Sequence, residues 1–184
     1  MKTFSTAFVV LALLAGCSPI TATYDIDDKI DFSKFKTYNF SEEAEKLPIQ
    51  DLDRERILKA IDREMAARGF TKTDKPDALV DVFVRLEEKK RATATSPAYG
   101  FGGYGGAVYG YGGGFSTTNI DVHEYVEGTL FINFIDLGIE KIVWQGRGTK
   151  TLNENASGEK KEKNINYGVQ KIYTKFPVKP VVAK

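Results

Sequence analysis

The chain has 184 residues, of which 42% are hydrophobic and 28% are charged, with 26 Lys and Arg against 25 Asp and Glu. This length and hydrophobic content suit one domain with a buried core and exclude a disordered chain. The balanced charge argues against nucleic acid as a partner, because such binding needs clustered Lys and Arg. The single Cys excludes a disulfide framework and any zinc site that uses several Cys.

The first residues have the pattern of an export signal. Lys2 carries a positive charge, and the apolar run from Ala7 to Ala15 is shorter than the roughly 20 helical residues that a bilayer span needs. The run ends in Leu14-Ala15-Gly16-Cys17, which resembles the lipobox of bacterial lipoproteins. The resemblance implies that residues 1–16 are a signal peptide, cleaved after Gly16.

The same resemblance implies a diacylglyceryl and N-acyl lipid on Cys17. Each buried CH₂ group adds roughly 0.8 kcal/mol, so three acyl chains anchor the protein durably. Ser18 stands where many lipoproteins of the inner membrane carry Asp. The implied location is therefore the periplasmic leaflet of the outer membrane, with residues 17–24 as the lipidated Cys and a polar tether.

A strand pattern and a helix pattern follow the tether. Residues 35–40 are rich in β-formers and favour a strand, with Tyr38 and Phe40 on one face. Residues 51–68 favour a helix, and Gly69 supplies the left-handed conformation that ends it. The apolar stripe of this helix is formed by Ile57, Leu58, Ile61 and Met65.

Strand patterns continue in the second half of the chain. Residues 78–86 alternate between apolar and polar side chains, as a half-buried strand does. Residues 128–135 and 139–145 predict two strands joined by a short turn. Residues 158–175 predict a last helix, with an apolar stripe at Ile165, Val169, Ile172 and Phe176.

This order of elements predicts an α+β domain over residues 25–177, followed by an extended tail at 178–184. Two helices packed on a mostly antiparallel sheet of four or five strands would bury the apolar faces of both. A long Gly/Tyr-rich loop, residues 96–115, interrupts the pattern. It holds nine of the seventeen glycines, and that density opposes any regular element.

The loop is the main candidate for a contact surface. Its aromatic side chains can stack on sugar rings, enter a groove of a partner protein or settle at a lipid–water interface. Alternatively they fold back onto their own sheet, or the loop is an inert insertion. The candidate partner-binding residues are Tyr99, Phe101, Tyr104, Tyr109, Tyr111 and Phe115.

Three other patterns are weak. His123-Glu124 begins like a zinc-protease signature, but the second His is absent. Residues 100–105 match G-x-G-x-x-G, yet more glycines follow where the dinucleotide-binding helix would have to start. A cluster of acids is better interpreted as a solvated or helix-capping stretch than as a calcium loop: Asp25, Asp27, Asp28 and Asp31. We therefore expect no metal, and no cofactor apart from the lipid on Cys17.

A Gly-Thr-Leu strand is followed by Val-Trp-x-Gly at residues 128–146. Four further segments accompany this hairpin, at residues 31–38, 57–61, 67–70 and 75–80. Taken together, these segments resemble the bacterial lipoproteins gathered as domain of unknown function family 4136 (DUF4136), of which the hairpin is the most characteristic piece. The resemblance implies an envelope lipoprotein with an α+β domain and brings no established activity.

Individual residues carry further expectations. Asn133 stands where the family often has Asp, and Phe40 stands where it often has Trp. Trp144 and Tyr38 are most simply core aromatics. Two glycines, Gly128 and Gly146, are most simply strand-edge or bulge residues.

The function favoured by the sequence is a non-catalytic periplasmic module. It would be held at the outer membrane by Cys17 and would contact an envelope protein or glycan through the Gly/Tyr-rich loop or a sheet edge. The alternative is an envelope-associated enzyme acting on cell-wall or lipid substrates. In that enzyme His123 or a pair of Asp residues would act as general acid and base.

Overall fold

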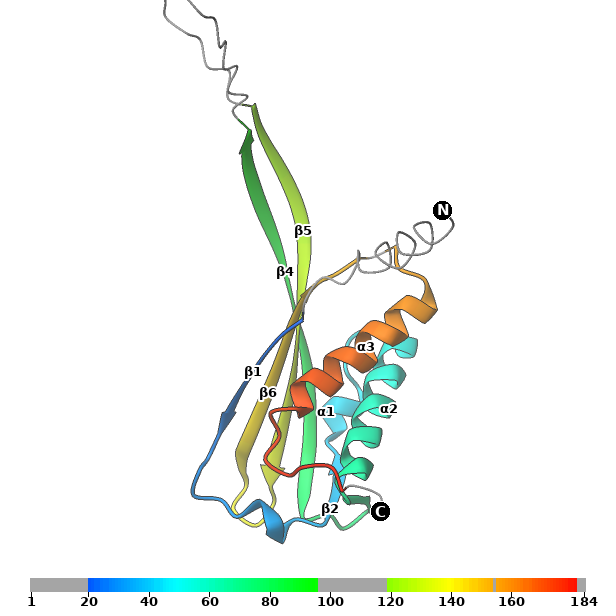
Figure 1. Ribbon diagram of the computed structural model, residues 1–184. Helices are drawn as coiled ribbons and strands as arrows, with labels where there is room; N and C mark the ends of the chain where they lie inside the picture. Colours follow the sequence, from blue (N-terminus) through cyan, green and yellow to red (C-terminus); the bar gives the residue numbers. More distant parts are fainter. Residues whose placement is uncertain (1–19, 96–118, 154, 182–184) are drawn as a thin grey trace, which may run out of the picture.

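The computed structural model describes residues 20–95, 119–153 and 155–181. Within them, six strands form one sheet, in the order β1-β6-β5-β4-β2-β3 (Figure 1). Neighbouring strands are antiparallel, except that β2 pairs in parallel with β3 and β4. The strands are β1 (Thr21–Ile26), β2 (Thr37–Phe40), β3 (Thr71–Lys72), β4 (Ala78–Thr95), β5 (Asn119–Asp136) and β6 (Lys141–Thr151).

Two long helices cover one face of the sheet (Figure 1). They are α2 (Asp51–Ala67) and α3 (Gly158–Tyr173), and a single turn, α1 (Glu42–Glu45), precedes α2. A short 3-10 helix, η2 (Phe32–Lys34), follows β1. None of the described helices is long and apolar enough to cross a membrane.

The mixed, mostly antiparallel architecture is confirmed, whereas the expected number of elements is wrong. The described part of the chain holds six strands and three α-helices, in place of four or five strands and two helices. Strand β1 begins at Thr21, inside the segment expected to be a tether, and β3 has only two residues. Strands β4 and β5 have 18 residues each, far more than the apolar alternation indicated.

The core lies between the sheet and the two long helices. Ile57, Ile61 and Met65 are buried in the apolar stripe of α2, and Val169 and Ile172 are buried in the stripe of α3. Gly69 follows α2 with a φ of 82°, which confirms the expected left-handed end. The sheet contributes Val80, Val82, Ile132, Phe134 and Trp144, all at most 1% exposed.

Trp144 is the largest side chain in this core. Its ring meets Phe176 edge-on with the centroids 4.9 Å apart, and its Nε1–H donates to the carbonyl of Lys175 at 3.3 Å. Tyr38 is 2% exposed and donates to Asp62 on α2 at 2.6 Å. Burial, followed by the bond to the Asp62 carboxylate, raises the pKa of the Tyr38 hydroxyl. Both residues are therefore core aromatics, as expected.

Gly146 has a different role from the expected strand-edge glycine. It lies inside β6, opposite Ile132 on one side and Tyr24 on the other. A methyl group at this position would lie 2.4 Å from Ile172 on α3 and 2.4 Å from the Trp144 ring. The glycine therefore allows α3 to approach the sheet. The bulge in β6 lies earlier, at Val143, where the register with β5 shifts.

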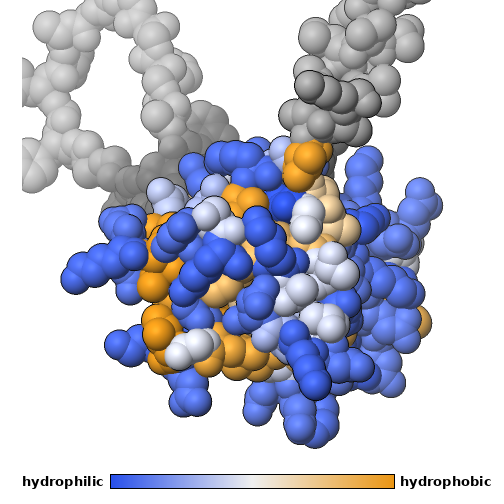
Figure 2. Space-filling view, turned by 90° about the horizontal axis from the view of Figure 1, so that it is seen from below, coloured by the Kyte–Doolittle hydropathy of each residue, from blue (hydrophilic) through white to orange (hydrophobic). Residues whose placement is uncertain are grey.

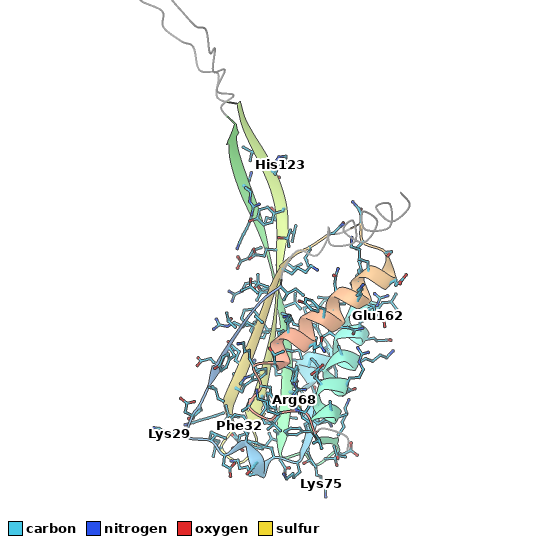
Figure 3. The ribbon with its side chains drawn as sticks, viewed as in Figure 1. Lys29, Phe32, Arg68, Lys75, His123 and Glu162 are labelled. Atoms are coloured by element: carbon cyan, nitrogen blue, oxygen red, sulfur yellow. The ribbon has the colours of Figure 1, made fainter. Side chains whose placement is uncertain are left out.

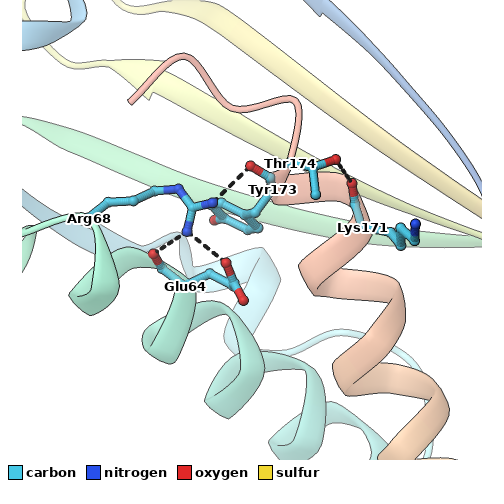
Figure 4. A network of polar contacts seen from close by, with 5 residues as sticks. All are labelled: Glu64, Arg68, Lys171, Tyr173 and Thr174. Atoms are coloured by element: carbon cyan, nitrogen blue, oxygen red, sulfur yellow. Dashed lines mark hydrogen bonds and ion pairs between the residues drawn. The ribbon is translucent and has the colours of Figure 1, made fainter. Parts of the chain in front are cut away.

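A buried arginine joins the ends of the two long helices (Figure 4). Arg68 donates to the backbone and carboxylate oxygens of Glu64 at 2.8 and 2.6 Å, and to the carbonyl of Tyr173 at 2.9 Å. Its side chain is 4% exposed, and its guanidinium lies 5.1 Å from the centre of the Tyr173 ring. The Tyr173 carbonyl also accepts from the Phe176 N–H at 3.1 Å, so Arg68 adds a second donor at the last turn of α3.

Candidate contact surface

Strands β4 and β5 extend well beyond the rest of the sheet (Figure 1). They pair without a register shift from Ala78↔Asp136 to Thr95↔Asn119. Strand β6 leaves β5 at Glu127, and β2 pairs with β4 only as far as Val80. Residues 88–95 and 119–126 therefore form a two-stranded ribbon, about 26 Å long at the usual rise per residue.

Charged pairs occupy the base of the ribbon. Lys89 donates to Glu127 across the strands at 2.7 Å, and Lys90 pairs with Glu124 at 2.6 Å. The bond to Glu127 raises the pKa of the Lys89 ammonium. Exposed pairs of this kind contribute little stability. They are consistent with the register of the two strands, in which Lys90 lies directly opposite Glu124.

The ribbon determines where the candidate loop is attached. The chain leaves the described residues after Thr95 and returns at Asn119, and these two residues are paired at the far end of the ribbon. The candidate lipid site Cys17, with Gly16 before it, also lies outside the described residues. So do all of the candidate partner-binding aromatics: Tyr99, Phe101, Tyr104, Tyr109, Tyr111 and Phe115.

His123 lies on this ribbon, at the end of the molecule opposite Phe32 and Lys75 (Figure 3). It is exposed and pairs in register with Arg91. A hollow of about 460 Å³ between α2 and α3 is lined by other residues, among them Glu55, Arg63 and Glu162. The structure thus does not bring His123 into a concave site.

The sheet face away from the helices carries a row of polar side chains that the sequence did not reveal. Ser41 donates to Asp81 at 2.8 Å, Asn133 donates to Asp81 at 3.2 Å, and Gln145 donates to Asn133 at 2.8 Å. The row crosses from the end of β2 through β4 and β5 to β6. Phe83 and Phe131 stack beside it with their centroids 4.2 Å apart.

This row explains the amide at position 133. Asn133 is 3% exposed and both donates and accepts in the row. A carboxylate there would accept only, and would face the carboxylate of Asp81 without a proton between them. The amide is therefore the group that completes the row when its neighbours are Asp81 and Gln145.

The expected acidic stretch is solvated and caps local structure. Asp25, Asp27, Asp28 and Asp31 are all exposed. Asp31 caps η2 by accepting from the Ser33 N–H at 2.9 Å, and hydrogen bonding from Ser33 lowers the pKa of its carboxyl. In the described ranges, no group of three His, Cys, Asp or Glu is placed to hold a metal ion.

The end of the molecule opposite the ribbon is mainly hydrophilic, with apolar residues along part of it (Figure 2). The turn between β5 and β6 exposes Leu137 and Ile139 there, and Ile142 follows at the start of β6. Asp136, the last residue of β5 before this turn, is 3% exposed and pairs with Lys34 at 2.6 Å. The ion pair lowers the pKa of the Asp136 carboxyl and holds η2 against the turn.

The first described residue, Ile20, is packed against the body of the fold. A methyl group at Gly168 on α3 would lie 3.4 Å from Ile20 Cδ1, and one at Gly148 on β6 would lie 3.9 Å from Ile20 Cγ2. The chain is therefore fixed between β6 and α3 three residues after Cys17. The sequence of the expected tether, residues 17–24, did not predict this contact.

Comparisons with solved structures show that the fold occurs elsewhere. A PDZ domain protein from Parabacteroides distasonis matches with a TM-score of 0.51 and 18% identity over 89% of this chain and 36% of that chain. The present chain thus corresponds to little more than a third of that protein. The PelC dodecamer from Paraburkholderia phytofirmans matches with a TM-score of 0.45 and 9% identity over 84% of this chain and 94% of that chain.

Comparison with curated proteins gave no match. The model of one protein family, described as "Domain of unknown function (DUF4136)", matches residues 22–178. That range includes every described strand and helix, apart from the first residue of β1. The chain therefore belongs to the DUF4136 family, as its strand and hairpin segments led us to expect.

Proposed function

We propose that this protein is a non-catalytic, lipid-anchored module of the bacterial envelope that contacts a partner through its ribbon. Cys17 would hold it at the periplasmic leaflet of the outer membrane. The partner would be an envelope protein or a glycan, bound by the aromatic segment between the two ribbon strands. The observation that carries this proposal is the ribbon itself, which extends outside the sheet and away from the core.

The ribbon adds little to the stability of the fold. Ordering a residue costs about 1–2 kcal/mol of backbone entropy, and an isolated two-stranded hairpin is marginally stable in water. At its base Glu88, Lys90, Arg91 and Glu124 are all exposed, and Val122 is 56% exposed. Regular structure with so little burial supports a role in reaching outward from the body.

The sequence joined by the ribbon suits contact with another molecule. From Ala92 to Ile120 the chain has no charged residue, and the segment carries six Tyr and Phe among its glycines. Aromatic side chains supply large contact areas, and each Tyr hydroxyl can still hydrogen-bond. The ribbon would present these residues about 26 Å from the edge of the sheet.

The anchor is supported by the pattern that precedes the fold. Leu14-Ala15-Gly16-Cys17 ends an apolar run of the length that suits an export signal. The first described strand, β1, begins at Thr21, four residues after Cys17. The envelope-enzyme alternative is less well supported, because its one histidine, His123, is exposed on the ribbon.

A photo-crosslinking residue in place of Tyr104 tests the contact function. We expect irradiation of living cells that make the lipidated protein to give a discrete adduct, because the proposal places residue 104 at the contact. Mass spectrometry of the adduct would identify a protein partner or a glycan. The same residue placed at Lys163, exposed on α3, is the matched control and should give less of that adduct.

Equal adduct yields from the two positions would contradict the contact function. Absence of any adduct from position 104 in correctly localised protein would also contradict it. Adducts with lipid alone would assign the segment to the membrane surface instead.

A separate variant tests the anchor. We expect Cys17→Ser to prevent acylation and to leave the protein uncleaved or free in the periplasm, because the thioether cannot form without the thiol. Labelling with a radioactive fatty acid and fractionation of the cells measure both effects. Ser18→Ala, next to the lipidated residue, should still be acylated. Normal acylation of the Cys17→Ser variant would overturn the lipoprotein assignment.

A further inference from the structure

The outer edge of β4 pairs with β2 only from Ala78 to Val80. Ser41 N–H donates to the carbonyl of Val80 at 3.1 Å, so Val80 directs its backbone groups away from β5. Because the β4–β5 register has no shift, the same direction holds for the other even-numbered residues of β4. No described strand pairs with this edge beyond Val80. Leu86, Glu88 and Lys90 therefore direct backbone donors and acceptors outward.

The charges along this edge have an order that matches a second copy of the same strand. The sequence runs Glu87-Glu88-Lys89-Lys90-Arg91. In an antiparallel pair centred on Lys89, Glu88 lies opposite Lys90 of the second copy, and Glu87 lies opposite Arg91. Two-fold symmetry repeats each contact. Side chains directly opposite each other in antiparallel strands lie on the same face, so these charges would meet.

Other pairings of the same edge are less favourable. Centring the pair on Glu88 sets Glu88 against itself, and centring it on Lys90 sets Lys89 against Arg91. A parallel pair in register places every charge beside its own kind. In the favoured register the two Lys89 residues meet on the axis, and each already has carboxylates of its own chain at 2.7 Å (Glu127) and 3.8 Å (Glu87).

We propose that the protein forms a symmetric dimer in which the β4 edges of two copies pair antiparallel about Lys89. The two ribbons would then form one four-stranded sheet that joins the two bodies. This proposal goes beyond the contact function, because it assigns a second copy to the β4 edge and leaves the aromatic segment to the other partner, and it does not depend on the lipid anchor. Charged residues on an edge normally discourage pairing with foreign strands, and here their order selects a second copy.

Cysteine crosslinking tests the register. Residues on the two-fold axis that do not exchange hydrogen bonds have Cα atoms about 4.5 Å apart, within the range of a disulfide. The full chain carrying Cys17→Ser and Lys89→Cys should form a disulfide dimer on mild oxidation. The control is Cys17→Ser with Thr23→Cys, an exposed residue on the other edge strand, β1, and it should form less than about a tenth as much. Equal yields, or more dimer from position 23, would overturn the proposal.

Exchanging the charges at positions 88 and 90 tests the contacts between the two copies while Lys89 is kept. We expect Glu88→Lys and Lys90→Glu each to weaken dimerisation at least about tenfold in sedimentation equilibrium, because each turns two attractive contacts into repulsive ones. The double variant should return to within about threefold of the original. Within its own chain the residue at 90 would still face Glu124 with a like charge, so this recovery reports the contact between copies.

Glu162→Lys is the matched control for charge exchange, since this exposed residue lies on α3 and the net charge changes equally. It should leave the dimer unchanged. A chain that stays monomeric at about 100 µM, far above the micromolar range of ordinary association, would overturn the proposal. So would a double variant as weak as the single ones. Measuring the lipidated chain in detergent beside Cys17→Ser separates a failure of anchoring from a failure of self-association.

Discussion

Trp144→Ala is expected to lower the free energy of unfolding by about 3–5 kcal/mol, the usual cost of removing a large aromatic side chain from a packed core. The indole ring is 1% exposed and lies against Tyr173 and Phe176. Its loss leaves a cavity beneath the C-terminal end of α3 and removes the hydrogen bond to the carbonyl of Lys175. Few other single substitutions in this fold remove as much buried surface.

Urea denaturation followed by far-ultraviolet circular dichroism is the suitable measurement, because the variant lacks the only Trp in the chain. Tyr24→Ala serves as the matched control. Tyr24 is an aromatic residue of the neighbouring strand β1, but it is 48% exposed, and its removal should cost less than about 1.5 kcal/mol. Equal losses for the two variants would contradict the packing of Trp144 described above.

Arg68→Met is expected to cost roughly 2–4 kcal/mol, mainly because it removes the buried ion pair with Glu64 and the hydrogen bond to the Tyr173 carbonyl. Methionine keeps much of the packing of the side chain and removes its charge. The carbonyl of Tyr173 would keep only the Phe176 N–H, at 3.1 Å, as a donor, and Glu64, whose side chain is 21% exposed, would lose its partner. The junction between the ends of α2 and α3 should then loosen before the rest of the fold.

Hydrogen exchange resolved by residue can separate this local effect from a general one. The last turn of α3 should exchange faster in Arg68→Met, while the amides at the centre of β5 change only with global stability. Lys59→Met is the control on the same helix, because Lys59 forms an exposed pair with Glu55 at 3.3 Å. It should cost no more than about 0.5 kcal/mol. A similar cost for the two variants would show that Arg68 contributes no more than a surface charge.

The helices and the central strands could be predicted because their burial leaves a periodic pattern. The stripe on α2 and the alternation in the first half of β4 record directly which face meets the core. Strand β1 leaves no such record. Its six residues, Thr21–Ile26, are mostly exposed, and they form a strand because the edge of β6 offers them hydrogen bonds. The two-residue strand β3 is fixed in the same way, by β2.

The candidate contact surface was only partly predictable, for a similar reason. Glycine and aromatic content identified the segment between the two ribbon strands. The charged run Glu87–Arg91 gave no strand signal, because strand propensity reflects half-buried positions and this run is mostly exposed. Pairing with β5 gives it a strand conformation. The row from Ser41 to Gln145 was also hidden, since four polar residues far apart in sequence carry no common pattern.

The contact of Ile20 with Gly148 and Gly168 has a consequence for how the protein sits at a bilayer. Ile20 is the third residue after Cys17, which gives a covalent reach of at most about 11 Å. With Cys17 acylated as proposed, the corner formed by β6 and α3 is held at the headgroups. The linker is too short for the domain to turn its opposite side toward the bilayer. The lipoprotein would then keep one side of its domain toward the membrane. The fold would set the direction in which the ribbon extends from that side.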